Sequence, residues 1–480
     1  MPLSQSKLSH NSSSPPLGEG AGGGLSSSPL RRRELGRDLK QKINVVTLGC
    51  SKNLVDSEVL LNQLSMDGFE VVHDSDDSDS DIVVINTCGF IQDAKEESVN
   101  TIMQFVGAKG RGEIEKLYVM GCLSERYKLD LEKEVPEVDR FFGKFDIKAV
   151  VSELKATYRP EFIYERKITT PSHFAYLKIS EGCNRVCAFC AIPGMTGKHK
   201  SKSMEDLVKE AKYLAKSGVK EILLIAQDLS YYGIDLYGKG ILAELIQKVA
   251  EIEGIQWIRL HYLYPTKFPM DILPLFKTIP KLCKYVDIPL QHSANHVLKR
   301  MLRHVTTVET EALLEKIKAE VPGIAIRTTM LVGHPGETEE DFEQLKSFVT
   351  KHRFDRLGAF TYSHEEGTYG YKTYQDDVPE NVKQARAEEL MGIQQTISSQ
   401  LNAEKVGQTL QVIIDREDVE FYVGRSEFDS PEVDGEVLIS KEIPLKKGQF
   451  CTVEITGSEE FDLYGKVKNV LSGLEPLRAF

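Results

Sequence analysis

The feature that most constrains the fold is a series of six strand-like apolar segments, separated by helical stretches, between residues 173 and 404. The segments cover residues 176–179, 221–226, 257–262, 285–290, 325–332 and 357–362. Repeated β–α units of this kind place parallel strands side by side and cover them with helices. Six repeats predict a partial or full TIM-type barrel, whose active site lies at the carboxyl ends of its strands. A long exit helix is expected over residues 380–404.

A second α/β region precedes the barrel, over residues 42–150. Apolar strands are predicted at residues 43–48, 69–72, 81–87 and 117–120, with helices over residues 54–66 and 94–105. This alternation indicates a small doubly wound domain. Residues 151–172 are interpreted as a linker to the barrel.

The two ends of the chain differ in character from these α/β regions. Residues 1–41 are rich in Ser, Gly and Pro and are expected to form a disordered leader. Residues 405–475 alternate apolar and polar positions between Gly and Pro turns, which is typical of a small β-barrel.

Composition excludes several classes of protein. Eight cysteines in 480 residues are too few for a disulfide scaffold, and three of them lie within eight residues, which indicates metal binding in a reducing compartment. The cytoplasm is therefore expected. No apolar run reaches the ~18 residues that suggest a membrane span. The net charge of −12 argues against a broad electrostatic grip on nucleic acid.

The three clustered cysteines, Cys183, Cys187 and Cys190, directly follow the first predicted barrel strand. An iron cluster with four irons usually has four thiolate ligands, so three cysteines leave one iron open. An open iron can chelate the amino and carboxylate groups of S-adenosylmethionine, and electron transfer to the sulfonium then starts radical chemistry. The alternatives are a zinc loop, which normally needs a fourth ligand, or three unrelated buried cysteines.

Polar and glycine residues at other barrel strand ends are candidate cofactor contacts. The candidates are Gln227, Asp228, Gln291, Arg327, Gly333 and Gly336. The alternative is that they only make hydrogen bonds at the strand ends. His261 is interpreted as a structural histidine.

Three more cysteines occupy equivalent positions in the first domain. Cys50, Cys88 and Cys122 each directly follow an apolar strand. The carboxyl ends of parallel strands share one edge of a sheet, so these cysteines are expected to converge there. A second three-cysteine iron cluster is the sharper hypothesis, and three buried structural cysteines are the alternative.

Together these regions resemble the methylthiotransferases of the radical S-adenosylmethionine superfamily, over about residues 42–472. The sequence Thr-Leu-Gly-Cys-Ser-Lys-Asn-Leu-Val-Asp-Ser-Glu at residues 47–58 is similar to the RimO-type branch, which modifies a ribosomal protein. Residues 289–292 and 424–435 also resemble that branch. One departure is His334, where the family pattern leads us to expect Phe.

The resemblance implies a methylthio transfer to the β-carbon of an aspartate in small ribosomal subunit protein twelve. It implies two 4Fe-4S clusters, one on each cysteine triplet, together with S-adenosylmethionine and a low-potential electron donor. The C-terminal module would be TRAM-like. The cluster on Cys183, Cys187 and Cys190 would start the radical reaction, and the first-domain cluster would carry or activate the sulfur.

Charge distinguishes this hypothesis from a tRNA-modifying enzyme of the same family. Residues 405–468 hold 14 acidic and 8 basic side chains, a balance of −6. A module that grips tRNA should be basic, whereas an acidic one suits a basic protein partner. The tRNA adenosine methylthiotransferase stays an alternative. A non-catalytic iron–sulfur electron carrier is another, although a carrier needs neither an open iron nor a barrel.

Overall fold

The computed structural model describes residues 41–75 and 80–471 of the chain. The predicted leader, except for Gln41, and residues 472–475 of the predicted C-terminal domain lie outside the described residues. The chain divides into two units, Met1–Thr169 and Thr170–Phe480.

The first unit is built on a five-stranded parallel sheet with the order β2-β1-β3-β4-β5. Its strands are β1 (Lys42–Thr47), β2 (Glu70–His73), β3 (Ile82–Thr87), β4 (Lys116–Gly121) and β5 (Arg140–Phe141). Its helices are α2 (Ser51–Met66), α3 (Gln92–Gly110), α4 (Cys122–Glu134), α5 (Ile147–Glu153) and the short 3-10 helix η2 (Pro160–Phe162).

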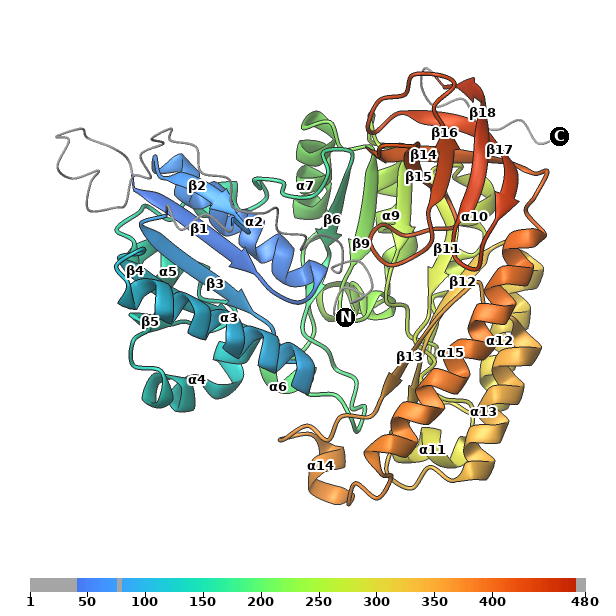
Figure 1. The fold of residues 1–480 in the computed structure, drawn as a ribbon, viewed down its shortest axis with the longest axis horizontal. Helices are drawn as coiled ribbons and strands as arrows, with labels where there is room; N and C mark the ends of the chain where they lie inside the picture. The colour runs from blue at the N-terminus through green and yellow to red at the C-terminus, as the bar shows by residue number, and fades with distance from the viewer. Residues whose placement is uncertain (1–40, 76–79, 472–480) are drawn as a thin grey trace, which may run out of the picture. The chain divides into compact units, whose positions relative to one another are not determined.

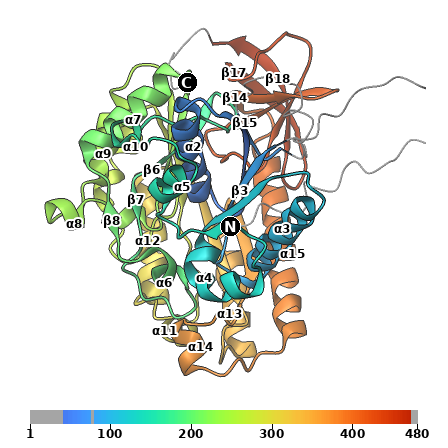
Figure 2. The ribbon, with the colours of Figure 1, turned by 90° about the vertical axis from the view of Figure 1, so that its left-hand side faces the viewer.

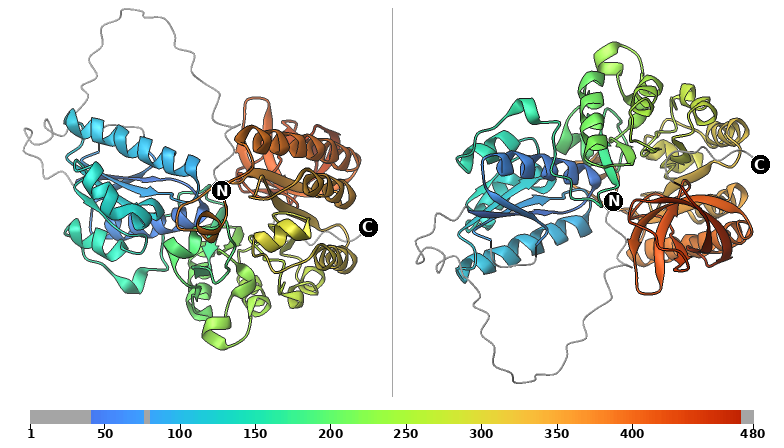
Figure 3. Two further views of the ribbon diagram at one scale, coloured as in Figure 1. Left: turned by 90° about the horizontal axis from the view of Figure 1, so that it is seen from below. Right: turned by 90° about the horizontal axis from the view of Figure 1, so that it is seen from above.

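Helices cover both faces of this sheet, as Figure 3 shows. Val84 packs into a core with residues of α2 and α5, whereas its neighbours Val83 and Ile85 pack into a second core with residues of α3 and α4. A strand buried on both faces has no polar side to alternate with, so its sequence is a continuous apolar run. The predicted doubly wound arrangement is confirmed.

Most of the segment interpreted as a linker belongs to the first unit and contacts its helix α2. Helix α5 crosses residue 150, and Arg166 forms a fully buried ion pair with Glu58 of α2, 2.6 Å from Nη1 to Oε2. Thr169 donates its backbone N–H to the other oxygen of Glu58. The predicted domain limits stay predictions, but residues 154–169 are tied to α2.

The second unit contains six parallel strands in the order β13-β12-β11-β10-β9-β6 (Figure 1). The strands are β6 (Phe174–Lys178), β9 (Glu221–Ile225), β10 (Trp257–Leu260), β11 (Leu282–Asp287), β12 (Ala325–Val332) and β13 (Arg356–Thr361). The outer strands β6 and β13 do not pair with one another within the described ranges. Of the two predicted forms, the structure is therefore the partial barrel.

Helices and two short strands connect these barrel strands, and Figure 2 shows α7 and α9 on the outer layer. The main helices are α7 (Met204–Lys216), α9 (Leu242–Ala250), α12 (Thr307–Glu320), α13 (Glu339–His352) and the exit helix α15 (Glu380–Ala403). The shorter elements are β7 (Ser180–Glu181), α6 (Ile192–Thr196), β8 (Lys200–Ser201), η3 (Leu229–Tyr231), α8 (Ile234–Tyr237), η4 (Met270–Ile272), α10 (Leu275–Thr278), α11 (Asn295–Arg300) and α14 (Tyr369–Thr373).

The C-terminal residues form the predicted small β-barrel, which is closed in the order β14-β15-β16-β18-β17 (Figure 3). Its strands are β14 (Thr409–Glu417), β15 (Phe421–Ser426), β16 (Val437–Ser440), β17 (Phe450–Ser458) and β18 (Leu463–Val470). Alternate apolar residues of these strands fill its interior.

Buried charges join this small barrel to the six-stranded sheet within the second unit. Arg425 of β15 lies 2.7 Å from Glu221 at the start of β9, measured from Nη2 to Oε2. Asp434, in the loop before β16, lies 3.4 Å from Arg327 of β12. Across residues 41–75 and 80–471, no helix has the length and apolar character needed to cross a membrane.

Candidate functional site

The three clustered cysteines lie in the loop that follows β6 and β7, at the carboxyl end of the partial barrel. The backbone fixes this loop at several points: Cys183 N–H donates to Gly197 O at 3.1 Å, and Cys190 N–H donates to Cys187 O at 3.1 Å. Ala188 N–H donates to Met301 O, in the loop that follows β11 and α11, at 2.9 Å. The three thiols are therefore held on one braced loop.

Burial governs the ionisation of Cys183 and Cys190. It raises the pKa of Cys183 to about 11 and that of Cys190 still further, and negative charge on neighbouring thiolates also opposes ionisation of both. Thiols in such a setting ionise when a cation binds them, because a coordinating metal removes the proton. The residues present therefore fit a positively charged iron centre.

Tyr264 and Arg303, which come from the ends of other strands, contact Cys187, and Arg185 of the cysteine loop itself packs on Tyr264. The Tyr264 hydroxyl lies 3.4 Å from the Cys187 sulfur, and Arg303 donates to the same sulfur at 3.5 Å. The Arg185 guanidinium lies over the Tyr264 ring and pairs with Asp228 at 2.8 Å. Burial raises the pKa of Tyr264, so its hydroxyl keeps the proton that it can donate.

In the first unit, the structure brings Cys50, Cys88 and Cys122 to one edge of the sheet. Cys50 follows β1 directly before α2, Cys88 follows β3, and Cys122 is the first residue of α4, directly after β4. A Cβ atom built on Gly49 would lie 2.6 Å from the Cys88 Cβ atom. One on Gly121 would lie 2.5 Å from the carbonyl oxygen of Thr87. The expected convergence is confirmed, and glycine is what permits it.

A buried lysine lies beside this second triplet. Lys144, with 2% of its side chain exposed, lies 3.2 Å from Asp56 and 3.3 Å from Asn53 Oδ1. Burial raises the pKa of Cys122 to about 12, and Lys144 opposes that shift. For Cys50, burial also raises the pKa, but Lys52, Lys144 and other favourable interactions outweigh it and give a net lowering. This triplet, too, suits thiolates bound to a cationic centre.

Neither cysteine triplet forms a site for one shared metal ion in the described residues. In the part of the chain that the structure describes, no three His, Cys, Asp or Glu side chains are grouped tightly enough to share one metal ion. In an iron cube each thiolate binds a different iron, so the sulfurs need not meet at one point.

Sequence reasoning missed Lys144, Asn53, Tyr264 and Arg303. Asn53 lies three residues after Cys50 and donates from Nδ2 to the carbonyl oxygens of Leu48 and Thr87, at the ends of β1 and β3. That spacing was a usable signal in the sequence. The other three residues come from loops far from any cysteine in sequence, and no local pattern distinguishes them.

Two of the predicted cofactor contacts at the barrel strand ends, Asp228 and Arg327, have charged protein partners in the structure. Asp228 binds Arg185 and caps η3 by accepting the Ser230 N–H at 2.9 Å. Arg327 lies 3.3 Å from Asp287 and 3.4 Å from Asp434. Gln227 and Gln291 are half-buried beyond the ends of β9 and β11. Their contacts with a cofactor stay predictions.

Gly333 and Gly336 leave room for side chains of the protein itself. A Cβ atom on Gly333 would collide with the Lys383 side chain, and one on Gly336 would lie 2.8 Å from Arg300 Nε. Glu337 accepts the Gly333 N–H at 2.7 Å and pairs with Arg386 at 2.8 Å. These contacts fix the turn after β12.

The two histidines singled out in the sequence, His261 and His334, are both buried among protein side chains. His334 is fully buried and its ring makes edge contacts with Tyr362 and Tyr374, at centroid distances of 5.1 and 5.8 Å. It therefore fills the aromatic place that Phe would occupy. His261 is buried, and its Nε2 lies 2.9 Å from the Ser430 hydroxyl.

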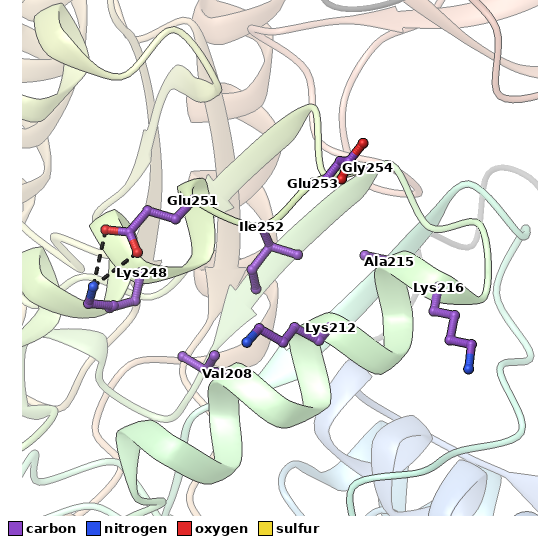
Figure 4. Close-up of a pocket in the computed structure, with 9 residues that line it drawn as sticks. All are labelled: Val208, Lys212, Ala215, Lys216, Lys248, Glu251, Ile252, Glu253 and Gly254. Carbon is purple, nitrogen blue, oxygen red and sulfur yellow. Dashed lines mark hydrogen bonds and ion pairs between the residues drawn. The ribbon is translucent and has the colours of Figure 1, made fainter.

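A separate cavity of about 680 Å³ lies between α7 and α9 (Figure 4). Its polar lining includes Lys212, Lys216 and Lys248, and Lys248 is paired with Glu251 at 2.9 Å. None of the predicted site residues lines it.

Three family models match the chain in the order of its domains. Residues 42–143 match the uncharacterized protein family UPF0004, residues 177–349 match the radical SAM superfamily, and residues 406–467 match the TRAM domain. Among solved structures, the radical S-adenosylmethionine methyltransferase TsrM from Kitasatospora setae superposes with a TM-score of 0.52 at 14% identity. The superposition covers 67% of this chain and 73% of the TsrM chain, and this likeness supports the fold alone.

Curated relatives are similar along almost their whole length. The protein named ribosomal protein uS12 methylthiotransferase RimO in Bacteroides thetaiotaomicron is 56% identical over 431 residues, which are 90% of this chain and 99% of the relative. The protein of the same name in Flavobacterium johnsoniae is 56% identical over 429 residues, 89% of this chain and 98% of the relative. With its three matched domains and two cysteine triplets, the chain belongs to the RimO family of radical S-adenosylmethionine methylthiotransferases.

Proposed function

We propose that this chain is a radical S-adenosylmethionine enzyme that adds a methylthio group to the β-carbon of one aspartate of ribosomal protein uS12. The observation that carries the proposal is the presence of two cysteine triplets, each at the carboxyl ends of parallel strands, in a chain 54–56% identical to proteins named for this activity. An unactivated C–H bond resists acid–base chemistry, which is why a radical step suits this substrate.

Cys183, Cys187 and Cys190 would hold a 4Fe-4S cluster with one iron open to S-adenosylmethionine. When bound, cluster and S-adenosylmethionine supply a radical able to remove hydrogen from an unactivated carbon. The chain braces the loop through Met301 and supplies polar groups next to Cys187. Gln227, Asp228, Gln291, Arg327, Gly333 and Gly336 are proposed to line or shape the place of the cofactor.

Cys50, Cys88 and Cys122 would hold the second 4Fe-4S cluster and carry or activate the sulfur. Lys144 is already buried beside Asn53 and paired with Asp56, and its charge favours the thiolate forms of Cys50 and Cys122. A low-potential one-electron donor is required as a partner, and we place the enzyme in the cytoplasm, where such thiols stay reduced.

The charge of the C-terminal barrel supports a basic protein substrate over tRNA, although less strongly than the sequence alone indicates. Asp429 and Asp434 are buried against Arg356 and Arg327, and Arg425 is buried against Glu221. Without these three residues the module still has 12 acidic and 7 basic side chains. Its solvated charge therefore stays negative, which suits a basic ribosomal protein.

The test is the intact mass of uS12 from cells with and without the gene, and from cells carrying Cys187→Ala. We expect the methylthio mass increment to disappear in the deletion and in Cys187→Ala. The matched control is Cys451→Ala, which removes a buried thiol from the core of the C-terminal barrel and should keep the increment. Unchanged uS12 together with tRNA that loses a methylthio mark would replace this proposal with the tRNA enzyme.

A further inference from the structure

Cys187 differs from the other two cysteines of its loop in receiving side-chain contacts from distant strand ends. Tyr264, in the loop after β10, places its hydroxyl 3.4 Å from the Cys187 sulfur. Arg303, three residues beyond α11, donates from Nη1 to that sulfur at 3.5 Å. Cys183, by contrast, accepts a backbone N–H, from Arg185 at 3.4 Å.

These two side chains are held in place by their own contacts. The guanidinium carbons of Arg303 and Arg185 lie 4.1 and 3.9 Å from the centroid of the Tyr264 ring. Two cations this close cannot share one face of a ring, so they cover its two faces. Arg303, only 3% exposed, also donates to the carbonyl oxygen of Pro289, and Arg185 is fixed by Asp228.

The burial of Arg303 points to an anion beside it. A guanidinium removed from water is costly unless a negative group compensates it. Its Nη1 points at the Cys187 sulfur, which becomes an anion when it binds iron. The arrangement is therefore suited to a thiolate and would be poorly matched to a neutral thiol.

We propose that Arg303 and Tyr264 are positioning residues that hold the Cys187 thiolate and raise the reduction potential of the cluster on Cys183, Cys187 and Cys190. This inference rests on the proposed function of that loop. Hydrogen bonds and positive charge at a ligand sulfur stabilise the more negative, reduced form of a cluster. Reduction by one electron from the donor then becomes easier, which is the step that every turnover needs.

The experiment is a redox titration followed by electron paramagnetic resonance on the full chain. The background carries Cys50→Ala, Cys88→Ala and Cys122→Ala, so that the signal comes from the barrel cluster alone. Into it we introduce Arg303→Met, Arg303→Lys and Tyr264→Phe.

We expect Arg303→Met to lower the ratio of reduced to oxidised cluster at a fixed solution potential by about tenfold, which is 59 mV for a one-electron couple. Tyr264→Phe should shift the potential less but in the same direction, because it removes only a hydroxyl. Arg303→Lys should recover part of the shift, because it restores the charge without the forked geometry.

The matched control is Arg300→Met, in the same segment. Arg300 stacks over Tyr374 at 4.2 Å and donates to Pro335 O, away from the cysteines. The cluster of the Arg300→Met variant should have the same reduction potential as the cluster of the background protein. The inference would be overturned if Arg300→Met and Arg303→Met shifted the reduction potential equally. It would also be overturned if Arg303→Met and Tyr264→Phe both kept the potential of the background protein. If the Arg303→Met variant binds no iron, the reduction potential of the cluster in Tyr264→Phe alone decides whether the inference holds.

The two proposals fail in different ways. A background protein without iron and labile sulfide means that the barrel cysteines hold no cluster, and the proposed function fails with it. If the background protein holds a normal cluster and its reduction potential does not change when Arg303 or Tyr264 is replaced, only this inference fails and the proposed function still stands.

Discussion

At the scale of single residues, the glycines beside the first-domain cysteines decide how closely three strand ends approach. Gly49 and Gly121 both have positive φ, +89° and +103°, which side chains rarely adopt. Both also lie against the next strand end, where a Cβ atom has no space. The cysteine positions were predictable from the strand pattern, but this steric demand was visible only once the strands were placed.

Gly49→Ala should therefore disturb the first cysteine triplet. The strained φ alone costs about 1–3 kcal/mol, and the added methyl group would displace Cys88. We expect lower iron content and a lower unfolding midpoint. The control is Gly110→Ala at the end of α3, where a Cβ atom meets nothing within 4 Å. Wild-type iron content in Gly49→Ala would contradict the packing described here.

Cys122→Ala should separate the two cluster functions. The variant should still cleave S-adenosylmethionine to deoxyadenosine, because the barrel triplet is intact, but it should lose methylthio transfer by at least ~100-fold. Anaerobic incubation with a reductant, followed by chromatography of the nucleoside and mass measurement of uS12, checks both. Transfer at the full rate would show that the first-domain site does not handle the sulfur.

Burial of His334 should make the stability of the fold depend on pH. Burial lowers its pKa to about 4, below the ~6.5 of an unfolded chain. Between these values the unfolded chain binds more protons, so stability falls as the pH drops below about 6.5. His334 should account for a loss of about 1 kcal/mol between pH 7 and 5.5.

We expect His334→Phe to show a weaker decline than wild type in urea unfolding midpoints over this pH range. His296→Gln, an exposed histidine on α11, is the control and should follow wild type. Identical slopes for His334→Phe and wild type would mean that this histidine is not held neutral in the fold.

At the scale of elements, the central apolar strands of the two α/β sheets were predictable because they are buried on both faces, whereas two features were not. Strand β5 has only two residues, too few for a periodic pattern. The segment over residues 154–169 has the composition of a linker, yet Arg166 anchors it to Glu58 over a sequence separation of 108 residues. Local patterns carry no information about such a distant partner.

Arg166→Met should release this segment. Removing one partner of a buried ion pair costs about 3–5 kcal/mol, because the remaining charge stays buried. Hydrogen exchange of residues 159–169 should rise sharply. The control is Arg111→Met, whose pair with Glu113 is solvent-exposed, so its loss should leave stability and exchange almost unchanged. Unchanged exchange in Arg166→Met would show that the ion pair does not hold the segment.

At the scale of the whole molecule, the order of domains and their fold classes were predictable from periodicity, but the joint between the two barrels was not. From the sequence alone, the acidic residues of the C-terminal module are interpreted as surface charge. In the structure Asp429 and Asp434 are buried against Arg356 and Arg327 of the six-stranded sheet. Part of the charge pattern therefore serves folding, and only the remainder can support the proposed contact with a basic partner.

The most direct test of the central claim is the iron and labile sulfide content of anaerobically reconstituted full-length protein. Two cubes predict about eight irons and eight sulfides per chain. Replacing Cys183, Cys187 and Cys190 by Ala should halve both numbers, and replacing Cys283 and Cys451 should change neither. Stoichiometric zinc, or protein without labile sulfide, would contradict the account.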